Sequence, residues 1–270
     1  MSILHRFGAL VLAFVPLFAG CVAGEPVEDL DEPPARPMDK NGSTGTNGLD
    51  SPEYFFNELH LVKAAASPLA DPGSTEVTAA VQSTLLSTPS GVEVFEYAVR
   101  CALPEDVTVT WGDTKMNGLG HLLSTEHWLQ SPLSEEATLS LLACMVAHVN
   151  PFGQHVPLLL TGPDVSFDGL DHDDFDVDEA LWVARRNAAG GIEYVVWPSE
   201  VLQKECGPDP MSALMQRVCG QSPGACHILQ GDPSDCVVDA ESGGYFCLGQ
   251  PALETTLRSK DLKVLYPGCF

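Results

Sequence analysis

The sequence predicts an α+β fold: a helical N-terminal part with a few strands, and a disulfide-rich, loop-rich C-terminal part. Three observations support this prediction. Apolar residues recur at helical spacing in several segments of the first half of the chain. Short β-branched segments lie between and after them. Six of the nine cysteines fall between residues 206 and 269, among Gly, Pro, Ser and Asp.

Two helices are expected before residue 87. Ser51 is a typical N-cap and Pro52 is a typical first helical residue, so the first helix would begin there. The apolar residues that follow recur at helical spacing. A second helix is expected over residues 75–86.

Two further helices each carry a cysteine. The third follows Pro89 and places Cys101 on its apolar face. The fourth opens at Ser134, where the acidic residues that follow suit the positive end of the helix dipole, and it places Cys144 on its apolar face. Because both cysteines face a core, we predict a disulfide between Cys101 and Cys144.

Short strands are expected where β-branched or alternating segments occur, at residues 106–111, 156–160, 180–184 and 192–197. Beyond Pro198 apolar material becomes sparse, so covalent links must supply much of the order. The six cysteines there allow many pairings, and the sequence does not choose among them.

Residues 1–20 resemble a bacterial lipoprotein signal peptide. A basic start precedes an apolar run over residues 7–18, and small residues precede Cys21. The run is shorter than the roughly 20 residues that a membrane-spanning helix needs, which argues against the alternative of a transmembrane anchor. The resemblance implies that Cys21 carries acyl chains such as palmitate. It also implies export, and Val22 after the cysteine favours the outer membrane. An ordinary secretory signal with a chance cysteine is the other alternative.

The rest of the chain divides by composition. Residues 21–48 are rich in Pro, Gly and acidic residues, and we expect a disordered tether there. Residues 49–198 are expected to form an α+β domain. Residues 199–270 are expected to form a Cys-rich region packed on that domain.

The cysteine count fits an exported protein. With Cys21 set aside for lipid, an even number remains, which predicts disulfides among them. A zinc site would favour closely spaced pairs of the C-x2-C type, and the sequence has none. No cofactor and no metal are therefore expected. The disulfide-forming cysteines are Cys101, Cys144, Cys206, Cys219, Cys226, Cys236, Cys247 and Cys269.

The formal net charge is −24. Such a field repels phosphate backbones and anionic headgroups, so nucleic-acid binding is excluded and membrane contact is expected only through the lipid at Cys21. Cations and basic proteins are the natural partners of this charge. The sequence does not identify which of them binds.

Carboxylates crowd residues 168–179, a density that suits calcium. Asp168 and Glu179 hold the first and last places of a twelve-residue loop, but Leu170 and His172 occupy ligand positions. An EF-hand is therefore excluded. A non-standard calcium loop and a solvated acidic loop both remain open.

Residues 220–224 match the G-x-S-x-G pattern of hydrolases. In that motif the backbone N–H of the residue after the serine stabilises the oxyanion, but here that residue is Pro223, which has no N–H. The segment lies between Cys219 and Cys226, so a disulfide-bounded turn is the better interpretation.

Histidines give a second hint of catalysis. His121 and His127 could combine with the acids of residues 168–179 in a site built from distant residues. His148 lies on the apolar face of the fourth helix and is expected to be a core histidine. Core positions are also expected for Trp128, Trp182 and Trp197.

Four sequence blocks, at residues 47–49, 97–104, 142–153 and 217–220, resemble a family of uncharacterised predicted lipoproteins of myxobacterial type. In that family a CALP block precedes an AC…A…N…G…V block and a Cys-rich tail. The resemblance implies lipid anchoring, disulfides and a single unit of architecture. It implies no activity.

Together these observations predict a lipid-anchored, disulfide-stabilised cell-envelope protein that acts as a non-enzymatic binding or structural module. Two alternatives remain. One is an exported hydrolase with a site of distant His and Asp or Glu residues. The other is a domain stabilised by Ca²⁺.

Overall fold

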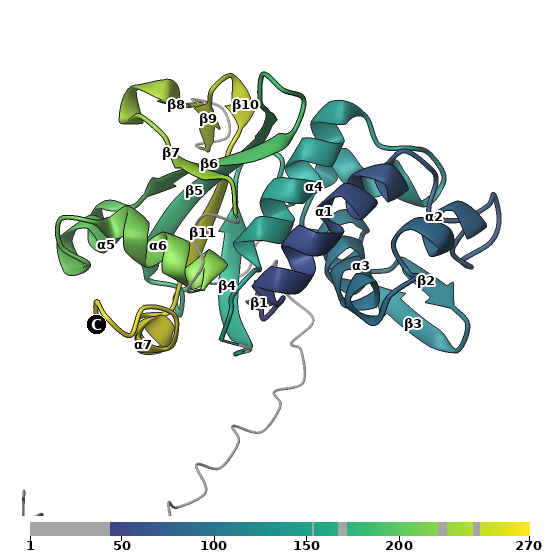
Figure 1. The fold of residues 1–270 in the computed structure, drawn as a ribbon, viewed down its shortest axis with the longest axis horizontal. Helices are drawn as coiled ribbons and strands as arrows, with labels where there is room; N and C mark the ends of the chain where they lie inside the picture. The colour runs from purple at the N-terminus through teal and green to yellow at the C-terminus, as the bar shows by residue number, and fades with distance from the viewer. Residues whose placement is uncertain (1–43, 153, 167–171, 221–225, 240–243) are drawn as a thin grey trace, which may run out of the picture. The chain divides into compact units, whose positions relative to one another are not determined.

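A six-stranded sheet organises the fold (Figure 1). The computed structural model describes residues 44–152, 154–166, 172–220, 226–239 and 244–270. Neighbouring strands are antiparallel except β6 and β7, which are parallel. Together with the helices, this sheet confirms the predicted α+β class. Its strands, in spatial order, are β1 (Thr44–Asn47), β4 (Val156–Thr161), β11 (Leu253–Leu257), β5 (Val177–Arg186), β6 (Ile192–Pro198) and β7 (Ile228–Gln230).

β11 comes from the C-terminal end of the chain but lies in the middle of the sheet. Its Thr255 pairs with Leu160 of β4 on one side and with Ala180 of β5 on the other. A register shift follows at Thr256, where β11 pairs with β5. Residues 199–270 therefore supply two strands, β7 and β11, to the sheet that earlier residues begin.

A layer of three helices covers one face of the sheet: α1 (Ser51–Ala65), α3 (Pro89–Ala102) and α4 (Glu135–Ala147) (Figure 1). α4 packs directly on β5 and β11, and α1 and α3 pack on it and on each other. α4 begins as predicted, because the Ser134 hydroxyl accepts a hydrogen bond from the Ala137 N–H at 3.1 Å.

The prediction that Ser51 caps α1 is wrong. Asp50 has the extended backbone of the N-cap residue, and its carbonyl accepts the first helical bond from the Tyr54 N–H at 2.9 Å. Ser51 is already helical and is buried.

The second predicted helix is shorter than expected, since α2 spans only Ala79–Thr84. The residues before it are extended, and the Val77 N–H donates to the Thr110 carbonyl at 2.9 Å. Thr110 belongs to β2 (Thr108–Trp111), which forms a hairpin with β3 (Thr114–Asn117). Pairing with this hairpin competes with the helical pattern and shortens the helix.

The two faces of the sheet carry separate cores. Trp182 and Tyr194 point into the main core beneath the helices, whereas Val183, Val195 and Trp197 point to the opposite face. There they pack with residues of a second, three-stranded sheet, whose strands are β8 (Cys236–Val238), β9 (Tyr245–Cys247) and β10 (Gln250–Pro251).

Short helices complete the C-terminal part. They are α5 (Glu200–Glu205), α6 (Pro210–Cys219) and α7 (Leu262–Leu265). Turns of 3-10 helix occur at η1 (Leu123–Leu129), η3 (Pro233–Asp235) and η4 (Ser259–Asp261). Among the helices of the described residues, none combines the length and apolar character that crossing a membrane requires.

Four disulfides cross-link the fold. Cys101 of α3 is joined to Cys144 of α4, the pairing expected from the sequence, with the Cα atoms 6.2 Å apart. The pairings that the sequence left open are Cys206–Cys269, Cys219–Cys226 and Cys236–Cys247. All the cysteines of the described residues are therefore paired with one another.

The expected tether, residues 21–48, ends earlier than predicted. Thr44–Asn47 form β1, which pairs with β4 in register from Thr44 opposite Leu159 to Asn47 opposite Val156. Backbone hydrogen bonds hold this strand, so a segment poor in apolar residues still takes a place in the sheet. Cys21 and the rest of the expected tether up to residue 43 lie outside the described residues.

Replacing Cys101 and Cys144 together with alanine should lower the free energy of unfolding by about 4 kcal/mol, because the lost cross-link spans 43 residues. The matched variant Cys236→Ala/Cys247→Ala opens a span of 11 residues and should cost about 3 kcal/mol. Denaturant unfolding at pH 7 measures both. A smaller loss for the longer span would contradict the expectation that the stabilisation grows with the length of chain that a disulfide closes.

Candidate functional site

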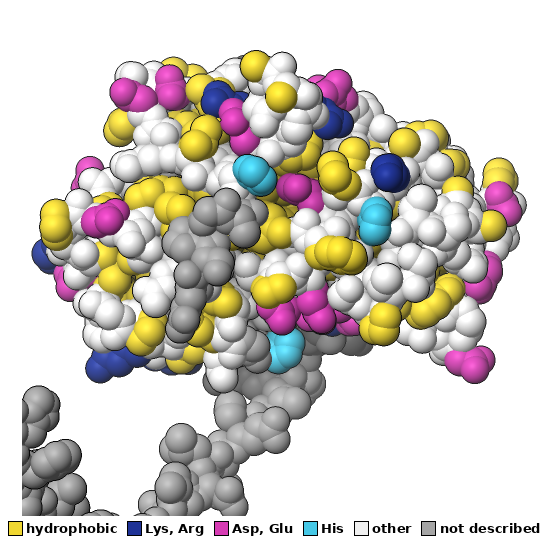
Figure 2. Space-filling view, viewed as in Figure 1, with side chains coloured by type: hydrophobic (Ala, Val, Ile, Leu, Met, Phe, Trp, Pro, Cys, Tyr) yellow, Lys and Arg dark blue, Asp and Glu magenta, His cyan; other side chains and the backbone are white. Residues whose placement is uncertain are grey.

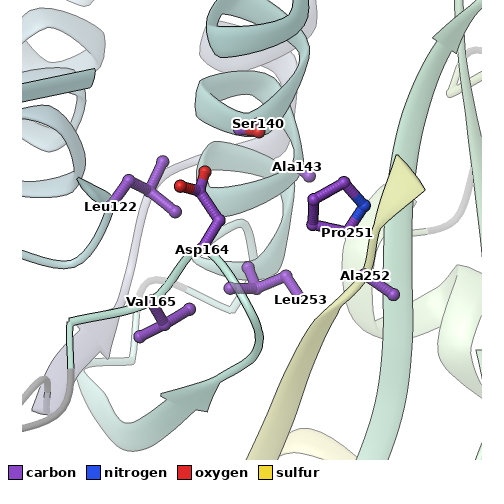
Figure 3. Close-up of a pocket in the computed structure, with 8 residues that line it drawn as sticks. All are labelled: Leu122, Ser140, Ala143, Asp164, Val165, Pro251, Ala252 and Leu253. Carbon is purple, nitrogen blue, oxygen red and sulfur yellow. The ribbon is translucent and has the colours of Figure 1, made fainter. Parts of the chain in front are cut away.

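Two hollows lined by described residues are the candidates for a ligand site. On the face shown in Figure 2 acidic side chains gather in several groups, in keeping with the net charge of −24. One hollow of about 10 Å³ lies between α4 and the chain at Pro251–Leu253 (Figure 3). That volume holds about one water molecule. Its carboxylate, Asp164, already accepts hydrogen bonds from the backbone and hydroxyl of Ser124.

A second hollow, of about 250 Å³, lies beside the Cys206–Cys269 disulfide. It is lined by α6 and the C-terminal turn, including Gln216 and Tyr266. Its carboxylate, Asp209, caps α6 by accepting a hydrogen bond from the Ser212 N–H at 2.9 Å. Ligand sites are usually larger, at roughly 300–1,000 Å³, and gather convergent polar groups. Neither hollow has that character.

The unusual chemistry lies inside the core instead, in three polar clusters. The first, the Arg217 cluster, consists of Arg217, Glu179 and Tyr266. Arg217 and Glu179 are both 0% exposed, and Arg217 Nε lies 3.0 Å from Glu179 Oε1, without the alignment of a hydrogen bond. Arg217 Nη2 donates to Glu179 Oε2 at 3.3 Å, and the Tyr266 hydroxyl donates to Glu179 Oε1.

The guanidinium of Arg217 also binds the end of α4. Nη1 donates to the Val149 carbonyl and Nη2 to the Ala147 carbonyl, each at 2.7 Å. The guanidinium carbon lies 5.6 Å from the centre of the Trp182 ring. Burial and the neighbouring Glu179 carboxylate raise the pKa of Tyr266, so its hydroxyl stays protonated and can donate. This cluster joins α4, β5, α6 and the C-terminal turn.

The Arg217 cluster overturns one expectation. Glu179 is not the last ligand of an acidic loop, because it lies within β5 and pairs with Arg217. Its carboxylate is therefore not available to calcium. Asp168 and Asp171 of the same stretch lie outside the described residues. Asp176 accepts a hydrogen bond from the Ser259 N–H at 2.7 Å, which makes it a partner of the C-terminal part.

The second cluster, the tyrosine cluster, consists of Tyr54, Tyr194 and Glu58. The hydroxyls of Tyr54 and Tyr194 lie 2.6 Å apart, and Tyr194 donates to Glu58 Oε1. Burial raises the pKa of Glu58, against the opposing effects of Tyr194 and of His227. Such a carboxyl could exchange a proton, but its closest partner is a buried tyrosine that joins α1 to β6. The cluster therefore acts first as a link between layers.

The third cluster, the histidine cluster, consists of His121 and His148 beside the Cys101–Cys144 disulfide. The ring centres lie 5.6 Å apart. His148 Nδ1 lies 2.8 Å from the Cys144 carbonyl, to which it donates. Neither ring nitrogen of His121 has a hydrogen-bond partner among the described residues. Burial lowers the pKa of both rings, that of His148 to about 4, so both are neutral at pH 7.

The histidine cluster has the spacing of a metal site but not its ligands. The sulfurs of Cys101 and Cys144 and His148 Nδ1 all lie within 4.8 Å of one another. Zinc binds thiolates, however, and these two sulfurs are bonded to each other at 2.06 Å. The histidine cluster is therefore a buried disulfide with two neighbouring imidazole rings, and its sulfurs are not available as zinc ligands.

The predicted catalytic histidines are not brought together. His121 is buried, as is His148, whereas His127 is exposed on η1. The G-x-S-x-G segment lies outside the described residues from Gln221 to Ala225, although the Cys219–Cys226 disulfide that bounds it is present. The three tryptophans predicted for the core, Trp128, Trp182 and Trp197, are all buried.

The sequence did carry a signal for Arg217, which was missed. Met211, Leu214 and Val218 form the buried face of α6, and Arg217 lies on the same face. A charged residue on an apolar helix face needs a buried partner. That partner, Glu179, lies 38 residues away in the chain, so local pattern could not name it.

A scan against models of protein families found no match. Searches of curated proteins and of solved structures also found no similar protein. The lipoprotein family that the sequence blocks resemble therefore stays a prediction.

Replacing Arg217 with methionine should lower the free energy of unfolding by about 3–5 kcal/mol, because Glu179 would be left as an unpaired buried charge. The double variant Arg217→Met/Glu179→Leu should recover much of that loss, since it removes both charges. Denaturant unfolding at pH 7 measures the difference. Equal losses in the single and double variants would show that Glu179 does not depend on Arg217.

Replacing His121 with leucine should raise the free energy of unfolding by about 1 kcal/mol at pH 7, because two buried polar atoms without partners are removed. The gain should grow as the pH falls below about 6.5. A buried histidine with a lowered pKa reduces the free energy of unfolding of the protein in that pH range, because the unfolded chain binds the proton at a higher pH than the folded protein does.

Thermal or denaturant unfolding at pH 7 and pH 5 checks this prediction. His127→Leu, at an exposed position, is the matched control and should change little. A destabilised His121→Leu protein would mean that the ring holds a necessary partner.

Proposed function

We propose that this chain is an exported, lipid-anchored cell-envelope protein that acts as a non-enzymatic binding or structural module. One observation carries the proposal. The eight cysteines between 101 and 269 pair with one another in four disulfides, so Cys21 has no cysteine of its own chain to pair with. Structural disulfides are typical of oxidising compartments. A single leftover cysteine at the end of a signal-like segment suits lipid attachment.

The placement of the polar groups supports a role without catalysis. His121 and His127 do not meet, and Glu179 is taken by Arg217. The hydrolase alternative, as built from those residues, therefore loses its support. The three buried clusters each connect separate elements, which suits a stable scaffold.

In this proposal the lipid anchor supplies the membrane binding that the charge of the chain does not. With a net charge of −24, the chain is repelled by anionic headgroups and gains no electrostatic attraction to a membrane. A single acyl chain gives only marginal binding, so stable anchoring needs more than one. Acyl groups such as palmitate at Cys21 would supply it, and Val22 suits an outer-membrane destination.

The variant Cys21→Ser should move the protein from the membrane fraction to the soluble fraction and abolish labelling with a palmitate analogue. Val22→Ala, next to the anchor, is the matched control and should leave labelling unchanged. Fractionation and metabolic labelling in a bacterial host that acylates lipoproteins measure both. If Cys21→Ser protein stays with the membrane, the anchor is not lipid at this residue.

A further inference from the structure

The outer face of α1 is an apolar surface that nothing in the described part of the chain covers. Phe56 and Leu59 lie one turn apart on it and are 68% and 59% exposed. The His60 ring contacts Phe56 edge-on, with ring centres 6.2 Å apart. The opposite face of α1, with Tyr54 and Leu61, is fully buried, so the helix is firmly held while its outer side chains face solvent.

An acidic group flanks this face. Asp50 and Glu53 lie at the start of α1, and Glu93 and Glu96 lie on the neighbouring α3. The two helices meet there, where Asn57 donates to the Ser90 hydroxyl at 3.1 Å. In Figure 2 acidic side chains gather next to apolar ones on this side of the molecule.

Most carboxylates of the acidic group have no basic side chain as a partner among the described residues. Glu96 pairs with Arg100, but no cation pairs with Asp50, Glu53 or Glu93 among the described residues. Burial and the neighbouring Glu53 carboxyl raise the pKa of Glu93 to about 7. The ionised form of Glu93 is therefore disfavoured here, and a ligand that brings positive charge would stabilise it.

We propose that the outer face of α1 and the acidic group beside it form one docking surface for a basic amphipathic helix of a partner protein. This proposal deepens the binding role proposed above and rests on it. Phe56 and Leu59 would contact apolar side chains at helical spacing on the partner helix. Lys or Arg side chains of the partner would reach Glu53 and Glu93.

Charge complementarity selects this occupant over others. A second copy of the chain would bring its own acidic group, and the chain has 37 acidic against 13 basic residues. A membrane surface with anionic headgroups would be repelled in the same way. Lys63 lies in the last turn of α1, at the other end of the helix. The basic end of the partner helix should therefore lie over the N-terminal end of α1.

The test uses the full chain, purified in detergent, and a fluorescent synthetic helix that carries Leu on one face and Lys on the other. A peptide with Glu in place of Lys and a scrambled peptide of the same composition serve as matched probes. Binding is followed by fluorescence anisotropy at low and physiological salt. The amphipathic basic peptide should bind at least tenfold more tightly than either of the others.

Two pairs of substitutions locate the surface. Phe56→Ser/Leu59→Ser and Glu53→Gln/Glu93→Gln should each weaken binding at least tenfold, and the second pair should also reduce its salt dependence. The control Val237→Ser/Val238→Ser alters an equally exposed apolar pair, 64% and 60% exposed, on β8 and should leave binding unchanged. Circular dichroism verifies that each variant is folded.

Three results would overturn the proposal. The scrambled peptide could bind as well as the amphipathic one, or the control pair on β8 could weaken binding as much as the pair on α1. Sedimentation could also show a dimer that Phe56→Ser/Leu59→Ser dissociates, which would make a second copy the occupant. Because binding is measured without reference to the anchor, these outcomes are separate from the failure of Cys21→Ser to leave the membrane.

Discussion

The buried ion pair of Arg217 and Glu179 is the constraint on which the rest of the structure depends. Removing a charged group from water reduces the stability of the fold by several kcal/mol. For the buried pair of Arg217 and Glu179, this loss is offset only if the two charges are close together and their remaining donors and acceptors form hydrogen bonds. Here the carbonyls at the end of α4 accept hydrogen bonds from Nη1 and Nη2 of Arg217, and the hydroxyl of Tyr266 donates to Glu179. Nε lies 3.0 Å from the same carboxylate without a hydrogen bond. The pair is therefore stable only when α4, β5, α6 and the C-terminal turn are all in place. This requirement couples the two halves of the chain.

The sheet imposes the same coupling through the backbone. β11 fills the place between β4 and β5, so neither of those strands has its inner neighbour until the C-terminal end of the chain arrives. The Cys206–Cys269 disulfide then fixes that end to the residue after α5. Contacts so distant in sequence are slow to form, and the disulfides hold them once formed. The protein is thus organised around its last strand, although its helical layer comes from the first half.

In this arrangement the polar groups that stabilise the protein are buried, whereas the groups that a partner would contact are exposed. The polar clusters of Arg217, Tyr194 and His148 face inward and connect elements. The outer side of α1 presents apolar and acidic side chains on a helix whose inner side is held by the core. A rigid helix of this kind loses little conformational freedom when it is covered. An anchored module that binds a basic partner would need that combination.

The sequence by itself determined the α+β class, the helices α1, α3 and α4, the strands β5 and β6, the buried tryptophans and the Cys101–Cys144 pairing. These features follow from local periodicity and from residues whose apolar faces must meet. Only the tertiary structure decided the central place of β11, the strand at Thr44–Asn47, the other three disulfides and the burial of Glu179 against Arg217. Each of those depends on a partner far away in the chain. A local pattern shows that a residue needs a partner, but the packing of the whole chain decides which partner it meets.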